Sequence, residues 1–177
     1  FEITGIKDFF IPPCLSKIEK RWCIDSYNLN KIIISPKNDN FIFEDGKYLI
    51  GKTDNNSNNY DKLLFVSQDI KHAIIPSNVK IINSYVFHSL KKLAKIEFEA
   101  NSNLQKIKKC SFDFTNIKCI SIPSSVSKIS DCAFYHCKNL KIIEIPDESH
   151  LQSFSILEND LNDTIIMIPK NVANCFL

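Results

Sequence analysis

The stretch "ISIPSSVSKISDCAFYHCKNLKIIEIP" (Ile120–Pro146) contains one short phrase twice, an isoleucine followed by a proline, at Ile122-Pro123 and Ile145-Pro146. Similar apolar phrases occur along the chain, and the residues that close them are spaced by 23, 41, 23, 24, 23 and 23 positions. Self-similarity at a nearly fixed period indicates a repeat architecture. The chain is therefore a series of units that close at Ile11, Ile34, Ile75, Phe98, Ile122, Ile145 and Ile168.

Each unit is predicted to end in a short β-strand, because its last three residues read I-x-I, with apolar residues at the first and third positions. Proline lacks an amide donor, so the strand is expected to end where proline follows. Phe87, Phe112 and Phe134 are expected to enter the interior from turns or short 3₁₀ segments. One unit cannot bury such a face alone, so the units must stack. The pattern predicts a solenoid of about 23-residue repeats, with short parallel strands about 4.8 Å apart in a curved sheet and the turns opposite.

The unit resembles the BspA-type leucine-rich repeat, L-x-x-I-x-I-P-x-x-V-x-x-I-x-x-x-A-F-x-x-C. The segments "LKIIEIP" and "IPSSVSKISDCAFYHCKNL" match this pattern nearly position by position. The segments "FIFEDGKYLIGK" and "LLFVSQDIKHAIIPSNV" further resemble BspA-like surface proteins of flagellated mucosal parasites. The resemblance covers most of the chain and is weakest from Ser155 to Asn162. It implies a single leucine-rich-repeat domain over residues 1–177.

The 41-residue interval contains an insertion at about residues 38–66. Phe41–Phe43 and Tyr48–Ile50 flank Asp45-Gly46, and this pattern predicts a β-hairpin with a tight turn. Lys52–Lys62 is too polar to bury and is expected to be a loop, and Leu63–Val66 is expected to return as a strand. The insertion is interpreted either as a decoration typical of the family or as a binding feature.

Composition excludes several functional classes. The 177 residues carry a formal charge of +2 without a Lys/Arg run, which disfavours nucleic-acid binding. With three glycines, the chain has no phosphate-binding glycine loop. No apolar run approaches the length of a membrane span, so membrane insertion by this chain is not predicted. The first and last phrases are unfinished repeats, and we expect them to continue in a longer protein or to be covered by end-to-end or homo-oligomeric association.

The seven cysteines and four histidines contain no catalytic set, so a non-enzymatic protein is predicted. Cys132, His136 and Cys137 lie close together, and Cys110 would be a fourth ligand for zinc. The repeat instead places a small residue at Cys110 and Cys132, and the family resemblance implies a cysteine at Cys137, so neither a metal nor another cofactor is predicted. Cys110 and Cys132 occupy equivalent positions about 5 Å apart, so they are interpreted either as a disulfide or as packed thiols.

In each strand, the isoleucines that recur at the same positions of every repeat are expected to face the core. The residues between them are expected to face the concave side of the sheet. One such column places Phe10, Ile33 and Ile74 side by side, with polar neighbours. Exposed apolar groups with a polar rim mark interaction surfaces. The alternative is that the inserted hairpin or a neighbouring coil covers these residues. The predicted partner-binding residues are Phe10, Lys31, Ile33, His72, Ile74, Lys95 and Glu97.

The resemblance implies a cell-surface or secreted protein that binds a protein, matrix or glycoprotein partner and attaches to host cells, matrix or other microbes. The alternative is an intracellular, cytoplasmic scaffold for protein–protein interactions built from the same repeats. Asn55 and Asn162 begin N-x-S/T sequons, which become candidate glycosylation sites if the protein is secreted.

Overall fold

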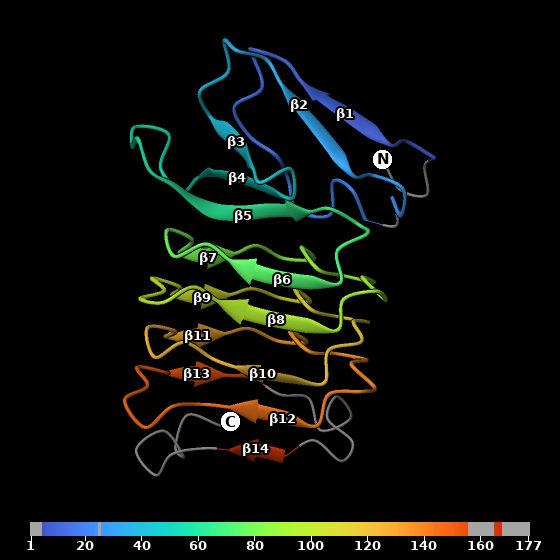
Figure 1. The fold of residues 1–177 in the computed structure, drawn as a ribbon. Helices are drawn as coiled ribbons and strands as arrows, with labels where there is room; N and C mark the ends of the chain where they lie inside the picture. Colours follow the sequence, from blue (N-terminus) through green and yellow to red (C-terminus); the bar gives the residue numbers. More distant parts are fainter. Residues whose placement is uncertain (1–4, 25, 156–164, 168–177) are drawn as a thin grey trace.

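The computed structural model describes residues 5–24, 26–155 and 165–167 and shows a stack of coils (Figure 1). One side of the stack carries the strands that the repeat predicts, and they pair in parallel. Each strand lies at the end of a unit, as expected. These strands are β1 (Asp8–Ile11), β2 (Lys31–Ile34), β6 (His72–Ile75), β8 (Lys95–Phe98), β10 (Cys119–Ser121), β12 (Ile142–Glu144) and β14 (Ile165–Met167).

This row of strands is divided into three hydrogen-bonded groups, β1–β2, β6–β8 and β10–β12–β14. The insertion separates the first two groups along the chain. The second division, between β8 and β10, falls where the repeat interval is 24 residues instead of 23. In that unit, the turn that follows Phe98 is two residues longer than the turn that follows Ile75.

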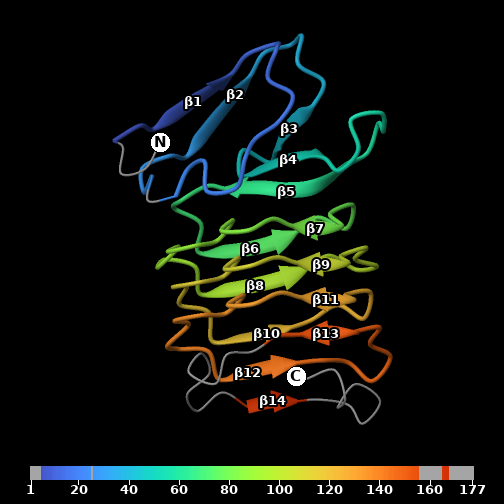
Figure 2. The same ribbon diagram turned by 180° about the vertical axis from the view of Figure 1, so that it is seen from behind.

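A second sheet, which the sequence analysis did not predict, forms another side of the stack (Figure 2). Its order is β13-β11-β9-β7-β5-β4-β3, and the strands from β5 to β13 are parallel. The four strands contributed by the repeats contain two residues each, which is too short for a periodic signal in sequence. They are β7 (Ile81–Ile82), β9 (Lys106–Ile107), β11 (Lys128–Ile129) and β13 (Ser153–Phe154).

The third side consists of turns, and the predicted phenylalanines enter the core from them. The Phe112 ring stacks on Phe87 at a centroid distance of 4.9 Å and on Phe134 at 5.3 Å. Two residues before each phenylalanine, Tyr85, Cys110 and Cys132 adopt positive φ angles of 65°, 54° and 55°. Backbone hydrogen bonds between coils, such as Phe112 N to Ala133 O at 2.9 Å, hold these turns in register.

The insertion forms three antiparallel strands, β3 (Phe41–Glu44), β4 (Tyr48–Lys52) and β5 (Tyr60–Val66). The predicted hairpin turn is present, with positive φ angles of 52° at Asp45 and 63° at Gly46. β5 begins at Tyr60, three residues before the predicted return to a strand. Asp61 explains this early start, because its buried carboxylate accepts hydrogen bonds from the Thr53 amide and hydroxyl and lies 3.3 Å from Lys80 Nζ.

Both faces of β4 and β5 are buried. Leu49 and Phe65 pack into an N-terminal cluster that includes Trp22, whose ring lies 5.7 Å from that of Phe65. Ile50 and Leu63 face the opposite way and pack into the main core of the repeats. The insertion is therefore an internal layer between two hydrophobic cores, and not a surface decoration of one coil.

Candidate functional site

The exposed side of β1, β2, β6, β8, β10, β12 and β14 is called here the strand face. Alternate residues of these strands are buried, and the residues between them point outward, as predicted. Phe10, Ile33 and Ile74 remain 55%, 42% and 46% exposed. The inserted hairpin therefore does not cover them. Lys31, His72, Lys95 and Glu97 are also exposed on this face.

Strand pairing brings together only some of the predicted partner-binding residues. Phe10 pairs with Ile33, and Ile74 pairs with Glu97. The expectation that Ile74 lies beside Ile33 is wrong, because β2 and β6 belong to separate sheets. The amide of Ile74 instead donates a hydrogen bond of 2.9 Å to the hydroxyl of Tyr48, which belongs to the inserted layer. The predicted site is thus divided into a Phe10–Ile33 patch and a group around Ile74.

Glu97 is the centre of the second group. Its carboxylate lies 2.8 Å from Lys95 Nζ and 2.5 Å from His72 Nε2. Hydrogen bonding to Lys95, with a further contribution from His72, lowers the pKa of Glu97. All three side chains are solvent-exposed, so these ion pairs orient the carboxylate more than they stabilise the fold.

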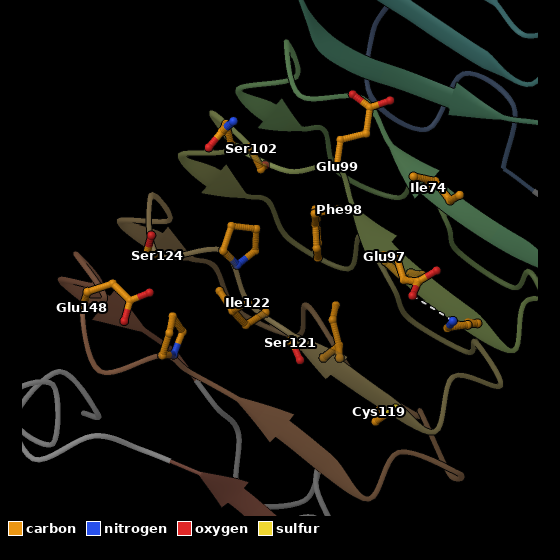
Figure 3. A pocket seen from close by; sticks show the side chains of 16 residues that line it. Ile74, Glu97, Phe98, Glu99, Ser102, Cys119, Ser121, Ile122, Ser124 and Glu148 are labelled. Carbon is orange, nitrogen blue, oxygen red and sulfur yellow. Dashed lines mark ion pairs between the residues drawn. The ribbon is translucent and has the colours of Figure 1, made fainter.

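A groove of about 750 Å³ lies where the β6–β8 and β10–β12–β14 sheets meet (Figure 3). Its wall includes three of the predicted residues, Ile74, Lys95 and Glu97. The rest of the wall was not predicted from the sequence. Two signals in the sequence mark this position, namely the 24-residue interval and the absence of proline after Phe98. The additional lining residues include Phe98, Glu99, Ser121, Ile122, Pro123, Ser124, Pro146 and Glu148.

The groove combines apolar and acidic groups. Ile74, Phe98, Pro123 and Pro146 supply apolar surface. Glu97, Glu99 and Glu148 supply carboxylates (Figure 3). The Glu99 carboxylate is oriented by a 2.8 Å hydrogen bond from the amide of Ser77. An apolar side chain flanked by basic groups would complement this surface, because opposite potentials favour association.

The other described residues considered as sites lie away from the strand face. Cys110 and Cys132 lie on the turn side and are not joined by a disulfide in the structure, and burial raises the pKa of Cys110. His136 faces Asp113, with Nδ1 3.4 Å from its carboxylate. The described ranges contain no group of three side chains arranged to hold a metal ion. Asn55 is exposed in the loop that precedes β5, and Asn162 lies outside the described residues.

The stacked coils and their exposed strand face define a leucine-rich-repeat solenoid, a class whose members generally bind proteins. Residues 59–175 match the family described as "BspA type Leucine rich repeat region", in six copies. The chain therefore belongs to the BspA-type leucine-rich repeat family. No curated protein matches the chain in sequence.

Solved structures share the fold. A leucine-rich repeat protein from Eubacterium ventriosum has a TM-score of 0.66 and 21% identity, over 93% of this chain and 49% of that one. A leucine rich cell surface protein from Faecalibacterium prausnitzii has the same score and identity, over 99% and 52%. The pneumococcal vaccine antigen PcpA has a TM-score of 0.64 and 14% identity, over 96% and 53%. The chain spans about half the length of these proteins. Within its described ranges, it has no helix with the length and apolar character needed to cross a bilayer.

Proposed function

We propose that this chain is a non-enzymatic adhesion module of a cell-surface or secreted protein, and that its strand face attaches to a protein, matrix or glycoprotein partner. The resemblance to surface proteins of flagellated mucosal parasites is the support for host cells as one of its targets. The membership in the BspA-type family and the likeness to a bacterial cell-surface protein support display at the surface.

The observation that carries the proposal is the exposure of large apolar residues in register on the strand face. Phe10 and Ile33 are neighbours across β1 and β2, and both are more than two-fifths exposed. Ile74 adds apolar surface at the edge of the groove, next to the Glu97 carboxylate. Apolar groups of this kind, rimmed by charges, supply the desolvated centre that protein interfaces need.

The test is binding of the chain to host cells and to immobilised matrix proteins, with the double variant Ile33→Asp and Ile74→Asp. We expect binding to be lost while the thermal melting curve is retained, because both side chains point into solvent. Asn28→Asp with Asn58→Asp is the matched control, because it adds the same two charges at exposed positions off the strand face. Undiminished binding by a folded double variant would refute the assignment of the strand face.

One observation favours the alternative of an intracellular scaffold. The six described cysteines form no disulfide with one another, and disulfides are rare in a reducing compartment. A glycan at Asn55 on protein isolated from its natural source would support secretion, whereas an unmodified Asn55 in cytosolic protein would support the scaffold.

A further inference from the structure

The second sheet presents a column of lysines that the sequence alone does not reveal. Strand pairing aligns Lys62 of β5, Ile81 of β7, Lys106 of β9, Lys128 of β11 and Ser153 of β13 (Figure 2). The next residue of each strand is buried, so this column points outward. Neighbouring positions of the column are about 4.8 Å apart. The three lysines thus form a line along the axis of the solenoid.

Two further lysines extend this line into a basic surface. Lys108 follows Lys106 on the same side of the sheet, and Lys20 belongs to the N-terminal coil. Burial lowers the pKa of Lys108, and the positive charges of Lys62, Lys106 and Lys20 lower it further. The five residues Lys20, Lys62, Lys106, Lys108 and Lys128 are called here the lysine ladder.

The nearby carboxylates are largely engaged elsewhere. Glu19 lies 2.7 Å from Lys17, which is not part of the ladder and is the main cause of the lowered pKa of Glu19; the charges of Lys62 and Lys20 contribute less. Asp61 is buried and faces Thr53 and Lys80. No ion pair to a ladder lysine is found among the described residues. The ladder therefore keeps positive charge that a ligand can neutralise.

A hollow of about 590 Å³ adjoins the ladder at Lys62. Lys17, Lys52 and Asp54 also line it, and the Asp54 carboxylate accepts a hydrogen bond of 2.9 Å from the backbone N–H of Asn56. The polar side chains of Asn55 and Asn56 line it as well. Amides of this kind donate and accept hydrogen bonds. The surface thus combines a line of ammonium groups with neutral amides and a single carboxylate, that of Asp54, in the adjoining hollow. The excess of ammonium groups and the amides suit a ligand that carries both anionic groups and hydroxyls.

The side chains of this surface indicate which class of polyanion it can bind. Sequence-independent binding of single-stranded nucleic acid relies on exposed aromatic rings for stacking, and interfacial attachment to membranes relies on exposed apolar side chains. The large exposed hydrophobic residues of the described chain lie elsewhere. None of them lies on β5, β7, β9, β11 or β13, the strands that carry the column. They are Phe10, Tyr27, Ile33, Ile74, Phe114, Ile142, Ile165 and Met167.

We propose that the lysine ladder binds a linear anionic polysaccharide with sulfate or carboxylate groups. Lysine binds such groups as a compact point charge, without the fixed geometry that arginine imposes. A linear polymer that lies along the solenoid axis meets one coil after another, so its charges contact several lysines at once. This site is separate from the strand face and does not depend on the function proposed for that face.

The test measures binding of the chain to immobilised heparin, used as the sulfated polysaccharide probe, across a range of salt concentrations. Lys62→Gln, Lys106→Gln and Lys128→Gln are combined in one variant, and Lys91→Gln, Lys118→Gln and Lys138→Gln form the matched control at exposed positions outside the ladder. We expect the ladder variant to bind heparin about 30- to 100-fold more weakly. The slope of log affinity against log salt concentration should correspond to the release of about two to three fewer counterions. The control should change affinity by less than about threefold.

Three outcomes would overturn the proposal: no binding of heparin by the unaltered chain, equal losses in the two triple variants, or stronger binding to duplex DNA or anionic phosphatidylserine vesicles than to heparin. Thermal melts of both variants establish that the fold is retained. The Ile33→Asp, Ile74→Asp variant should bind heparin as the unaltered chain does, so failure of the strand-face proposal and failure of this one are distinguishable.

Discussion

The substitution Phe65→Ala tests whether the insertion is an internal layer. Phe65 is fully buried, and its ring lies 5.7 Å from that of Trp22. Truncation of a buried phenylalanine to alanine costs about 3–5 kcal/mol, and that range includes the lost aromatic contact, worth about 0.5–1.5 kcal/mol. We expect a loss of about 4 kcal/mol, which is a large part of the total stability of an ordinary domain.

The opposite face of the same strand provides a second, independent probe. Leu63 is also fully buried, but it belongs to the main core of the repeats. Leu63→Ala is expected to cost about 2–5 kcal/mol. Asn58→Ala is the control in the same insertion, because Asn58 is exposed, and it should change stability by less than about 0.5 kcal/mol.

Urea unfolding followed in two ways separates the two faces. Trp22 is the only tryptophan, so its fluorescence reports on the N-terminal cluster, whereas far-UV circular dichroism reports on all strands. Phe65→Ala should lower the midpoint of the fluorescence transition most, and Leu63→Ala should lower that of the dichroism transition most, because each coil of a solenoid contacts only its neighbours. If Phe65→Ala costs less than about 1 kcal/mol, comparable to Asn58→Ala, the insertion is a surface addition and our interpretation is refuted.

Two further predictions concern the repeat register and the thiols. Phe134→Ala and Ile143→Ala should each cost about 2–5 kcal/mol, whereas Lys141→Ala should cost less than about 0.5 kcal/mol; thermal melts that rank Lys141→Ala as the most harmful would disprove the register. Burial raises the pKa of the Cys23 thiol to about 12, so at pH 8 it stays protonated and unreactive. Mass spectrometry after brief alkylation at pH 8 should find modified Cys14 and Cys119, which are exposed, before Cys23, which is partly buried; prior modification of Cys23 would contradict its raised pKa.

Much of the fold could be predicted from the sequence, because the structural repeat of a solenoid appears as a regular repeat of apolar residues along the chain. The phrases that end at Ile75, Ile122 and Ile145 mark where strands end, and the structure places strands there. The phenylalanines in step with them stack on one another in the core. The Asp45-Gly46 turn was likewise predictable, since few dipeptides adopt two consecutive positive φ angles so readily.

The repeat, its strands and the outward residues of each strand are therefore predictable from the amino-acid order, because they depend on local alternation and on contacts between successive units. Tertiary structure decided which outward residues meet. The two-faced inserted layer separates Ile33 from Ile74, and the junction between β8 and β10 forms the groove. It also aligned Lys62, Lys106 and Lys128, which are far apart in the chain and form no charged run. Such surfaces depend on register between distant coils, and only the stacked structure supplies that register.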